Sequence, residues 1–141
     1  KHNPCGSDSG LWVSAYDGVR TSDPGDFDVD HMVPLAEAWA SGARSWPEEK
    51  REAFANDLSP YSLIAVSASS NRSKSDQDPA EWMPENESFD CAYLARWIAV
   101  KFRWRLSIDP GERAFLRKSV SGCPAKALSL KGQVLPFSRS A

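Results

Sequence analysis

Two polar segments carry most of the chemistry in this sequence, and any fold of the chain has to accommodate both. Residues 28–35 read DVDHMVPL and residues 70–76 read SNRSKSD, so that Asn71 follows His31 by 40 positions. Together they contain an imidazole, carboxylates, a carboxamide and two cations. These are the groups that metal-assisted cleavage of a phosphodiester requires.

Length and composition predict one domain. The chain has 141 residues, of which 41% are hydrophobic, which is enough for one hydrophobic core and too little for two. We expect a single domain over residues 1–141, with a core at about 11–83, a helical extension at about 88–123 and a tail at 124–141. No window approaches the roughly 18 uninterrupted apolar residues of a membrane-spanning helix, so no membrane association is expected.

The charges are unevenly distributed along the chain. The formal net charge is −2, but residues 1–70 contain 5 Lys and Arg against 11 Asp and Glu, whereas residues 71–141 contain 12 against 8. Metal-dependent nucleases need carboxylates near the cation and basic groups near the phosphates, and the asymmetry is compatible with this arrangement. Charge clusters also occur on ordinary solvated surfaces.

The three cysteines favour a disulfide over a zinc site. They include no CxxC pair, and the chain has only 2 histidines. Cys91 and Cys123 flank successive apolar segments, so a Cys91–Cys123 bond between neighbouring helices is expected, together with secretion. Cys5 is then unpaired or bonded to a segment upstream of Lys1, because a chain without an initiator methionine is expected to be a processed product. Three buried thiols in a cytosolic protein are the alternative.

The pattern of apolar residues and turn residues places both polar segments. We expect a strand at 11–16 with a turn at 17–18 and a return at 19–21, a strand at 27–33, helices at 34–40 and 48–56, a strand at 61–66, a polar loop at 67–78, and helices beginning near Cys91 and Asp109. His31 then lies at a junction between a strand and a helix, and Asn71 lies in the loop. The Trp- and Arg-rich helix after Cys91 is expected to form core, with nucleic-acid contact as the alternative.

His31 and Asp30 have complementary chemistry. The unperturbed pKa of histidine, about 6.5, suits it to take a proton from water near neutral pH. Hard divalent cations prefer oxygen ligands such as the Asp30 carboxylate. In a regular strand the two side chains point to opposite faces, so a shared site requires the backbone to turn, as Pro34 indicates. Without a turn, Asp28 and Asp30 share a face, and we interpret Asp28 as a solvated acid.

The second segment complements the first. The carboxamide oxygen of Asn71 is a neutral hard ligand, and Arg72 and Lys74 are candidates to hold substrate phosphates. The order of these residues, D-x-D-H-x-V-P-L, an apolar strand and N-R-x-K-S-D, resembles the HNH, or ββα-metal, nuclease superfamily. The same order occurs in the HNH domain of RNA-guided CRISPR nucleases. Further motifs between residues 11 and 105 resemble its secreted bacterial branch, of actinobacterial type.

The resemblance implies an α+β fold with a ββα-metal core, made of a short antiparallel hairpin and a helix, and additional helices. It implies that His31 is the general base and that Asp30 and Asn71 bind one divalent ion, Mg²⁺ by preference with Mn²⁺ as an alternative, in cleavage that leaves 5′-phosphate ends. Glu37 is either a further group around the metal or a helix-surface acid. Ser62 stands where many HNH sequences have an asparagine that orders the site.

We therefore expect an extracellular, metal-dependent, monomeric endonuclease without a protein partner, which cleaves DNA, with RNA as an alternative, and has little sequence specificity. No recognition helix or zinc finger is evident in the sequence. Two alternatives to this expectation stay open. The first is a secreted, disulfide-stabilised module that binds nucleic acid without catalysis. The second is a nuclease toxin domain with the same chemistry.

Overall fold

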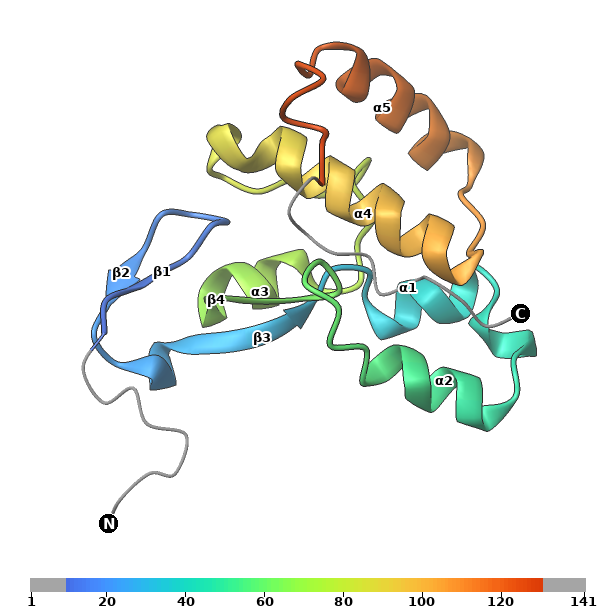
Figure 1. The fold of residues 1–141 in the computed structure, drawn as a ribbon, viewed down its shortest axis with the longest axis horizontal. Coiled ribbons are helices and arrows are strands. Elements are labelled where there is room, and N and C mark those ends of the chain that lie inside the picture. The colour runs from blue at the N-terminus through green and yellow to red at the C-terminus, as the bar shows by residue number, and fades with distance from the viewer. Residues whose placement is uncertain (1–9, 131–141) are drawn as a thin grey trace.

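The computed structural model describes residues 10–130, and the account below concerns that part of the chain (Figure 1). It contains two small antiparallel sheets and several helices, in agreement with the predicted mixture of strands and helices. The strands are β1 (Trp12–Val13), β2 (Arg20–Thr21), β3 (Phe27–His31) and β4 (Leu63–Ser67). The α-helices are α1 (Leu35–Ala40), α2 (Glu48–Ala55), α3 (Ala68–Lys74), α4 (Asp90–Trp104) and α5 (Pro110–Ser121), and the 3-10 helices are η1 (Pro24–Asp26), η2 (Ala43–Ser45) and η3 (Glu87–Phe89).

The first hairpin forms where the sequence predicts it, but its strands are shorter. β1 and β2 pair antiparallel around a turn in which Gly18 has a φ of 75°, a conformation that glycine adopts without steric cost. Extended structure stops after Val13 because the chain turns Tyr16 into the core, where its side chain is completely buried. The turn of the hairpin therefore places the phenol of Tyr16 in the core.

The second sheet consists of β3 and β4, whose paired residues run from Phe27 opposite Ser67 to His31 opposite Leu63. β3 ends at His31, two residues earlier than predicted, and Met32 and Val33 continue as a buried bend. α3 follows β4 without a loop and packs on both strands.

The predicted polar loop at 67–78 is wrong over its first half, because residues 68–74 form α3. Serines 69, 70 and 73 give this segment weak intrinsic helix propensity. Ser67 caps the helix by accepting a hydrogen bond from the Ser70 amide (3.3 Å), and the Asp17 carboxylate accepts hydrogen bonds from the hydroxyls of Ser67 and Ser70. Contacts with the distant hairpin thus stabilise a helix that local propensity does not predict.

α4 is the central helix and lies between α5 on one side and α3 and α1 on the other (Figure 1). Its buried face presents Tyr93, Leu94, Trp97 and Val100 to a core that also contains Val66 of β4 and Met32, which follows β3. This apolar face confirms that the Trp- and Arg-rich segment is core. None of the helices between residues 10 and 130 combines the length and apolar character needed to cross a membrane.

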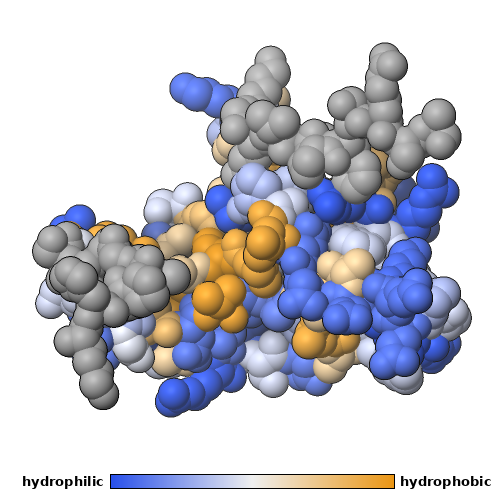
Figure 2. All heavy atoms as spheres, turned by 60° about the horizontal axis from the view of Figure 1, so that its bottom comes forward, coloured by the Kyte–Doolittle hydropathy of each residue, from blue (hydrophilic) through white to orange (hydrophobic). Residues whose placement is uncertain are grey.

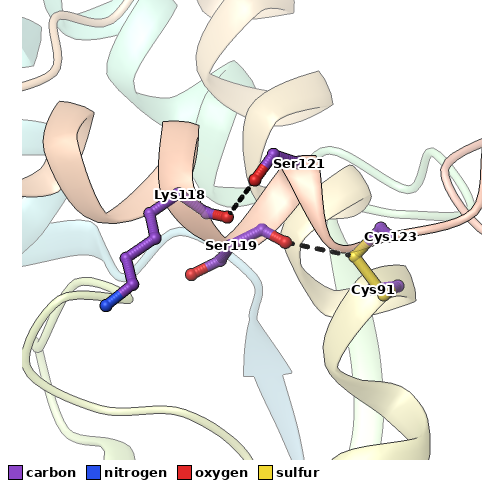
Figure 3. Close-up of a disulfide and its surroundings, with 5 residues drawn as sticks. All are labelled: Cys91, Lys118, Ser119, Ser121 and Cys123. Atoms are coloured by element: carbon purple, nitrogen blue, oxygen red, sulfur yellow. Dashed lines mark hydrogen bonds between the residues drawn. A yellow bond between two sulfur atoms is a disulfide. The ribbon is translucent and has the colours of Figure 1, made fainter.

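A disulfide joins the first turn of α4 to the segment just after α5, as Figure 3 shows. It connects Cys91 and Cys123, the pair predicted from the sequence, with the two Cα atoms 5.7 Å apart. Ser119 contacts the Cys123 sulfur through its carbonyl oxygen at 3.6 Å, but a disulfide sulfur carries no proton to donate. Cys5 lies outside the described residues, so its predicted partner stays untested.

Replacing both bridged cysteines, as Cys91→Ser with Cys123→Ser, is expected to lower the free energy of unfolding by about 3–4 kcal/mol. The bond closes a loop with a sequence separation of 32 residues, and the estimate is the chain entropy that such a loop restores to the unfolded state. Urea denaturation of the variant and the wild type measures the difference. Equal midpoints and slopes would show that the bond contributes nothing to stability.

Candidate active site

The two aspartates of β3 face α3. Because side chains alternate along a strand, Asp28 and Asp30 share one face, while Val29 between them is 64% exposed on the other. Asn71 donates a hydrogen bond from Nδ2 to Asp28 Oδ2 (3.2 Å), and Lys74 contacts Asp30. Asn71 and Lys74 are three residues apart and therefore lie on one side of α3. Two polar pairs thus lie side by side between the sheet and the helix.

Lys74 is the most completely engaged polar group of the site. Its side chain is 0% exposed, and its ammonium donates hydrogen bonds to Asp30 Oδ2 (2.6 Å), the His31 carbonyl (2.7 Å) and the Met32 carbonyl (3.0 Å). All three donors of the ammonium are satisfied. In a regular strand, successive carbonyls point in opposite directions. Their convergence on one ammonium accompanies the backbone bend that follows His31.

Tyr16 completes the environment of Asp30 by donating its hydroxyl hydrogen to Asp30 Oδ2 (2.6 Å). Burial, reinforced by the Asp30 carboxylate, raises the pKa of Tyr16 far above its ordinary value, so the phenol stays a donor. Burial also lowers the pKa of Lys74 below its usual value, and the Asp30 charge opposes this effect. Both described contacts of Asp30 involve Oδ2, which leaves Oδ1 without a hydrogen-bond partner among the described residues.

His31 points to the opposite side of β3, toward the end of α2. Its Nε2 lies 2.7 Å from the carbonyl oxygen of Ala55. A carbonyl oxygen can only accept, so Nε2 carries the proton and a neutral His31 has its lone pair on Nδ1. The contact therefore determines both the orientation of the ring and which nitrogen can act as a base.

Ser62 acts on the position of His31 indirectly, through Asp57. Its hydroxyl donates to Asp57 Oδ2 (2.7 Å), and Asp57 also accepts hydrogen bonds from Arg103 (3.2 Å) and Trp104 (3.1 Å). Burial alone would raise the pKa of Asp57, but these donors, led by Ser62, hold it below its ordinary value. Asp57 follows Ala55 by two residues. The residue that replaces the expected asparagine thus braces the segment whose carbonyl holds His31.

The predicted site residues are brought together only in part. β3 stays extended through His31, so the His31 ring lies on the face opposite Asp30 and Asn71, and the turn that a shared site requires comes only after it. Asp30 and Asn71 lie on neighbouring elements, yet each hydrogen bonds to another residue, Lys74 and Asp28 respectively. Arg72 is exposed on α3, as a phosphate contact requires. Lys74 is inaccessible to a substrate phosphate, so its predicted role is replaced by the structural one described above.

Glu37 is also placed differently from the prediction. Its carboxylate pairs with the Lys101 ammonium of α4 (2.6 Å), so it ties α1 to α4 instead of joining Asp30. The alternative prediction, a solvated helix-surface acid, does not describe it either, because its side chain is only 17% exposed.

Sequence reasoning missed the contribution of Asp28, of the Tyr16 hydroxyl and of the Ala55 carbonyl. Asp28 was interpreted as a solvated acid, but it is half-buried against Asn71. The sequence contains a signal for this contact. Asp28 and Asp30 are two residues apart on a strand, and Asn71 and Lys74 are three residues apart on a helix, so each pair lies on one face. The signal can be used only if residues 68–74 are recognised as a helix. The contacts of Tyr16 and Ala55 have no local signal.

Another acidic group lies away from β3. Among residues 10–130, Asp78, Asp109 and Glu112 have carboxylate oxygens within 4.8 Å of one another. Glu112 already accepts hydrogen bonds from Trp97 (2.6 Å) and Lys101 (3.3 Å). Asp109 caps α5 by accepting from the Glu112 amide (2.9 Å). These contacts account for Glu112 and Asp109 structurally.

Replacing the buried cation, as Lys74→Met, is expected to lower the free energy of unfolding by about 3–5 kcal/mol, because it leaves the Asp30 carboxylate buried without its cation. Urea denaturation measures the loss. The matched control is Arg72→Met on the exposed side of the same helix, which should change stability by less than about 0.5 kcal/mol. A second variant that adds Asp30→Asn should recover part of the loss. Equal stabilities of the two single variants would contradict the assignment.

Stability is expected to fall at acid pH partly through Asp57. Its pKa is lower in the folded protein than the ordinary 3.8, so its contribution is present above pH 3.8 and is lost as pH falls through the lowered value. The free energy of unfolding of Asp57→Asn should therefore vary less with pH in this range. Urea denaturation at a series of acid pH values measures it, with the exposed Asp76→Asn as control. Parallel curves for wild type and Asp57→Asn would refute the assignment.

Comparison with known proteins identifies the family of this chain. Residues 10–117 match the family model for the C-terminal domain of GmrSD restriction endonucleases. An uncharacterized secreted protein of Arthroderma benhamiae is 44% identical over 119 residues, which are 84% of this chain and 58% of the relative. The chain thus spans less than two thirds of that relative's length. No solved structure matches it significantly. The predicted HNH relationship is confirmed at family level, and the chain belongs to the family of GmrSD restriction endonuclease C-terminal domains.

Proposed function

We propose that this chain is a secreted, metal-dependent endonuclease that hydrolyses phosphodiester bonds of DNA, with RNA as an alternative substrate and little sequence preference. Family membership supports a nuclease-related function and a nucleic-acid substrate. The relative in Arthroderma benhamiae is a secreted protein, which supports secretion of this chain. The disulfide is in keeping with an oxidising compartment.

The observation that carries the proposal is the hydrogen bond between His31 and the Ala55 carbonyl (2.7 Å). A general base must be neutral, must keep one nitrogen free and must be held in position. The hydrogen bond places the proton of the neutral ring on Nε2 and leaves the lone pair of Nδ1 to take the proton of an attacking water. A fixed ring with a free Nδ1 is what the proposed proton transfer requires of His31.

The residues present fit a divalent cation. Asp28 and Asn71 already lie together, and turning the Asn71 amide would present its oxygen beside the Asp28 carboxylate. Asp30 retains Oδ1, while Lys74 and Tyr16 hold Oδ2. We propose that Asp28, Asn71 and Asp30 Oδ1 hold the ion, since hard oxygen donors are what Mg²⁺ prefers. Such an ion, when bound, stabilises charge on the phosphate and on the departing oxygen.

Arg72 and Lys74 take different parts in this proposal. Arg72 is exposed on α3, where its guanidinium can bind a substrate phosphate in a bidentate manner. Lys74 positions Asp30 and neutralises part of the carboxylate charge. It acts through Asp30 and does not contact the substrate.

One observation favours the second candidate, a module that binds nucleic acid without catalysis. The Lys74 ammonium contacts one oxygen of Asp30, a predicted metal ligand, and a nearby cation weakens the attraction of the carboxylate for a metal. Retention of nucleic acid in EDTA without turnover under any divalent metal would support this candidate.

Supercoiled plasmid should be nicked and linearised by the wild type with Mg²⁺ or Mn²⁺, and EDTA should abolish the reaction. His31→Gly should lose about 10²–10⁴-fold in rate, the usual contribution of a general base. Added imidazole should restore part of it, because the free base replaces the missing ring. Gel assays of rate against imidazole concentration measure this rescue.

The control for that experiment is Arg117→Gln, at an exposed position of α5, which should cleave at the wild-type rate. Calorimetric titration with Mn²⁺ tests the metal ligands independently of turnover. Asp28→Ala should weaken binding, whereas Asp26→Ala, which changes an exposed neighbour, should not. Equal cleavage by wild type and His31→Gly with and without EDTA would overturn the proposed function.

A further inference from the structure

A groove lies between α1 and α2, next to the candidate active site. It has a volume of about 500 Å³, and Leu35, Trp39 and Phe54 contribute apolar walls. Sites for small organic ligands have volumes of roughly 300–1,000 Å³, so the groove can accept a group of the size of a nucleobase. The face that Figure 2 turns forward carries apolar areas bordered by polar residues.

Ala55 connects this groove to His31. The residue lines the groove, and its carbonyl accepts the hydrogen bond from His31 Nε2. A ligand in the groove is thus separated from the candidate general base by one residue at the end of α2. The groove therefore lies on the same side of β3 as the His31 ring.

Trp39 offers an exposed aromatic surface in the groove. Its side chain is 52% exposed, and the Arg51 guanidinium lies 5.5 Å from the centre of its ring, within the range of a cation–π contact. Arg51 also donates a hydrogen bond to the Trp46 carbonyl. The cation is thereby held in place, and an exposed part of the indole stays open to a second planar group.

The charges at the groove select the kind of planar group. Glu48 and Glu52 line it together with Arg51, so two carboxylates meet a single cation. This balance disfavours phosphate. The two carboxylates favour a neutral ring whose N–H groups donate hydrogen bonds to them, such as the exocyclic amino groups of nucleobases.

We propose, on the basis of the proposed nuclease function, that this groove binds one unstacked nucleobase of a single-stranded nucleic acid, stacked on Trp39. The base enters the groove while its backbone continues past His31. Stacking on an aromatic side chain tolerates every base, because each base has a π face. Such a subsite adds affinity for unpaired strands, with a modest preference for bases that carry an exocyclic amino group.

The first test is binding without cleavage. A fluorescein-labelled DNA oligonucleotide of about twelve nucleotides, within the range bound by single-strand modules, is titrated in EDTA and followed by anisotropy. Trp39→Ala should raise Kd on the order of tenfold, the loss expected for one stacked base. Trp39→Phe should stay within about threefold of wild type, because it keeps a π face. The control is Phe102→Ala on α4, an aromatic residue that is 85% exposed and away from the groove.

The second test locates the base relative to the cleaved bond. Single abasic positions are moved along the oligonucleotide, and kcat/KM is measured with Mg²⁺. An abasic nucleotide at one position should lower kcat/KM of the wild type. The same abasic nucleotide should not change kcat/KM of Trp39→Ala, because the two changes remove the same contact. Independent, additive effects at every position would overturn the proposal.

The outcomes separate this inference from the proposed function. Cleavage by the wild type with unchanged binding by Trp39→Ala would refute the subsite and leave the nuclease intact. Binding in EDTA that depends on Trp39, without cleavage under any metal, would refute the nuclease and retain the subsite. A wild-type dimer in sedimentation that Trp39→Ala dissociates would assign the groove to a second copy of the chain and overturn the proposal.

Discussion

The buried ion pair between Lys74 and Asp30 is the interaction on which the arrangement of the candidate site depends. An ammonium withdrawn from water is stable only when its charge and its three donors are satisfied. Asp30 supplies the charge, and the carbonyls of His31 and Met32 supply the remaining acceptors. The pair therefore holds α3 against β3, and the two carbonyl contacts hold the backbone of His31 and Met32 at the bend that follows the strand.

The side chain of His31 depends on a second set of contacts. Its ring is held by the Ala55 carbonyl at the end of α2, and Asp57 just beyond is bound by Ser62, Arg103 and Trp104. His31, the proposed general base, is thus positioned by a helix terminus, which the last turn of α4 holds in place through Arg103 and Trp104. The site consequently depends on the helical extension as well as on β3, β4 and α3.

The two polar pairs between β3 and α3 divide the work of the site. Lys74 and Tyr16 orient Asp30 from the buried side, whereas Asp28 and Asn71 lie half-buried at the open side. In the proposed function, Lys74 and Tyr16 hold Asp30 rigidly, and Asp28 and Asn71 join Asp30 Oδ1 as oxygen donors for the ion. This division explains how a chain with a lysine beside a predicted metal ligand can still offer a cation site.

The sequence alone predicts the chemical groups of the candidate site, the main strands and helices, the Cys91–Cys123 pairing and the family resemblance. Each of these features depends on neighbouring residues or on their spacing along the chain. Only the tertiary structure decided that residues 68–74 are helical, that Lys74 is buried, that Glu37 pairs with Lys101 and that Ala55 holds His31. The physical reason is that a buried charge or polar group takes its partners from wherever the packed chain provides them, often tens of residues away. The motif therefore identifies the chemistry, and the packing assigns each side chain its role.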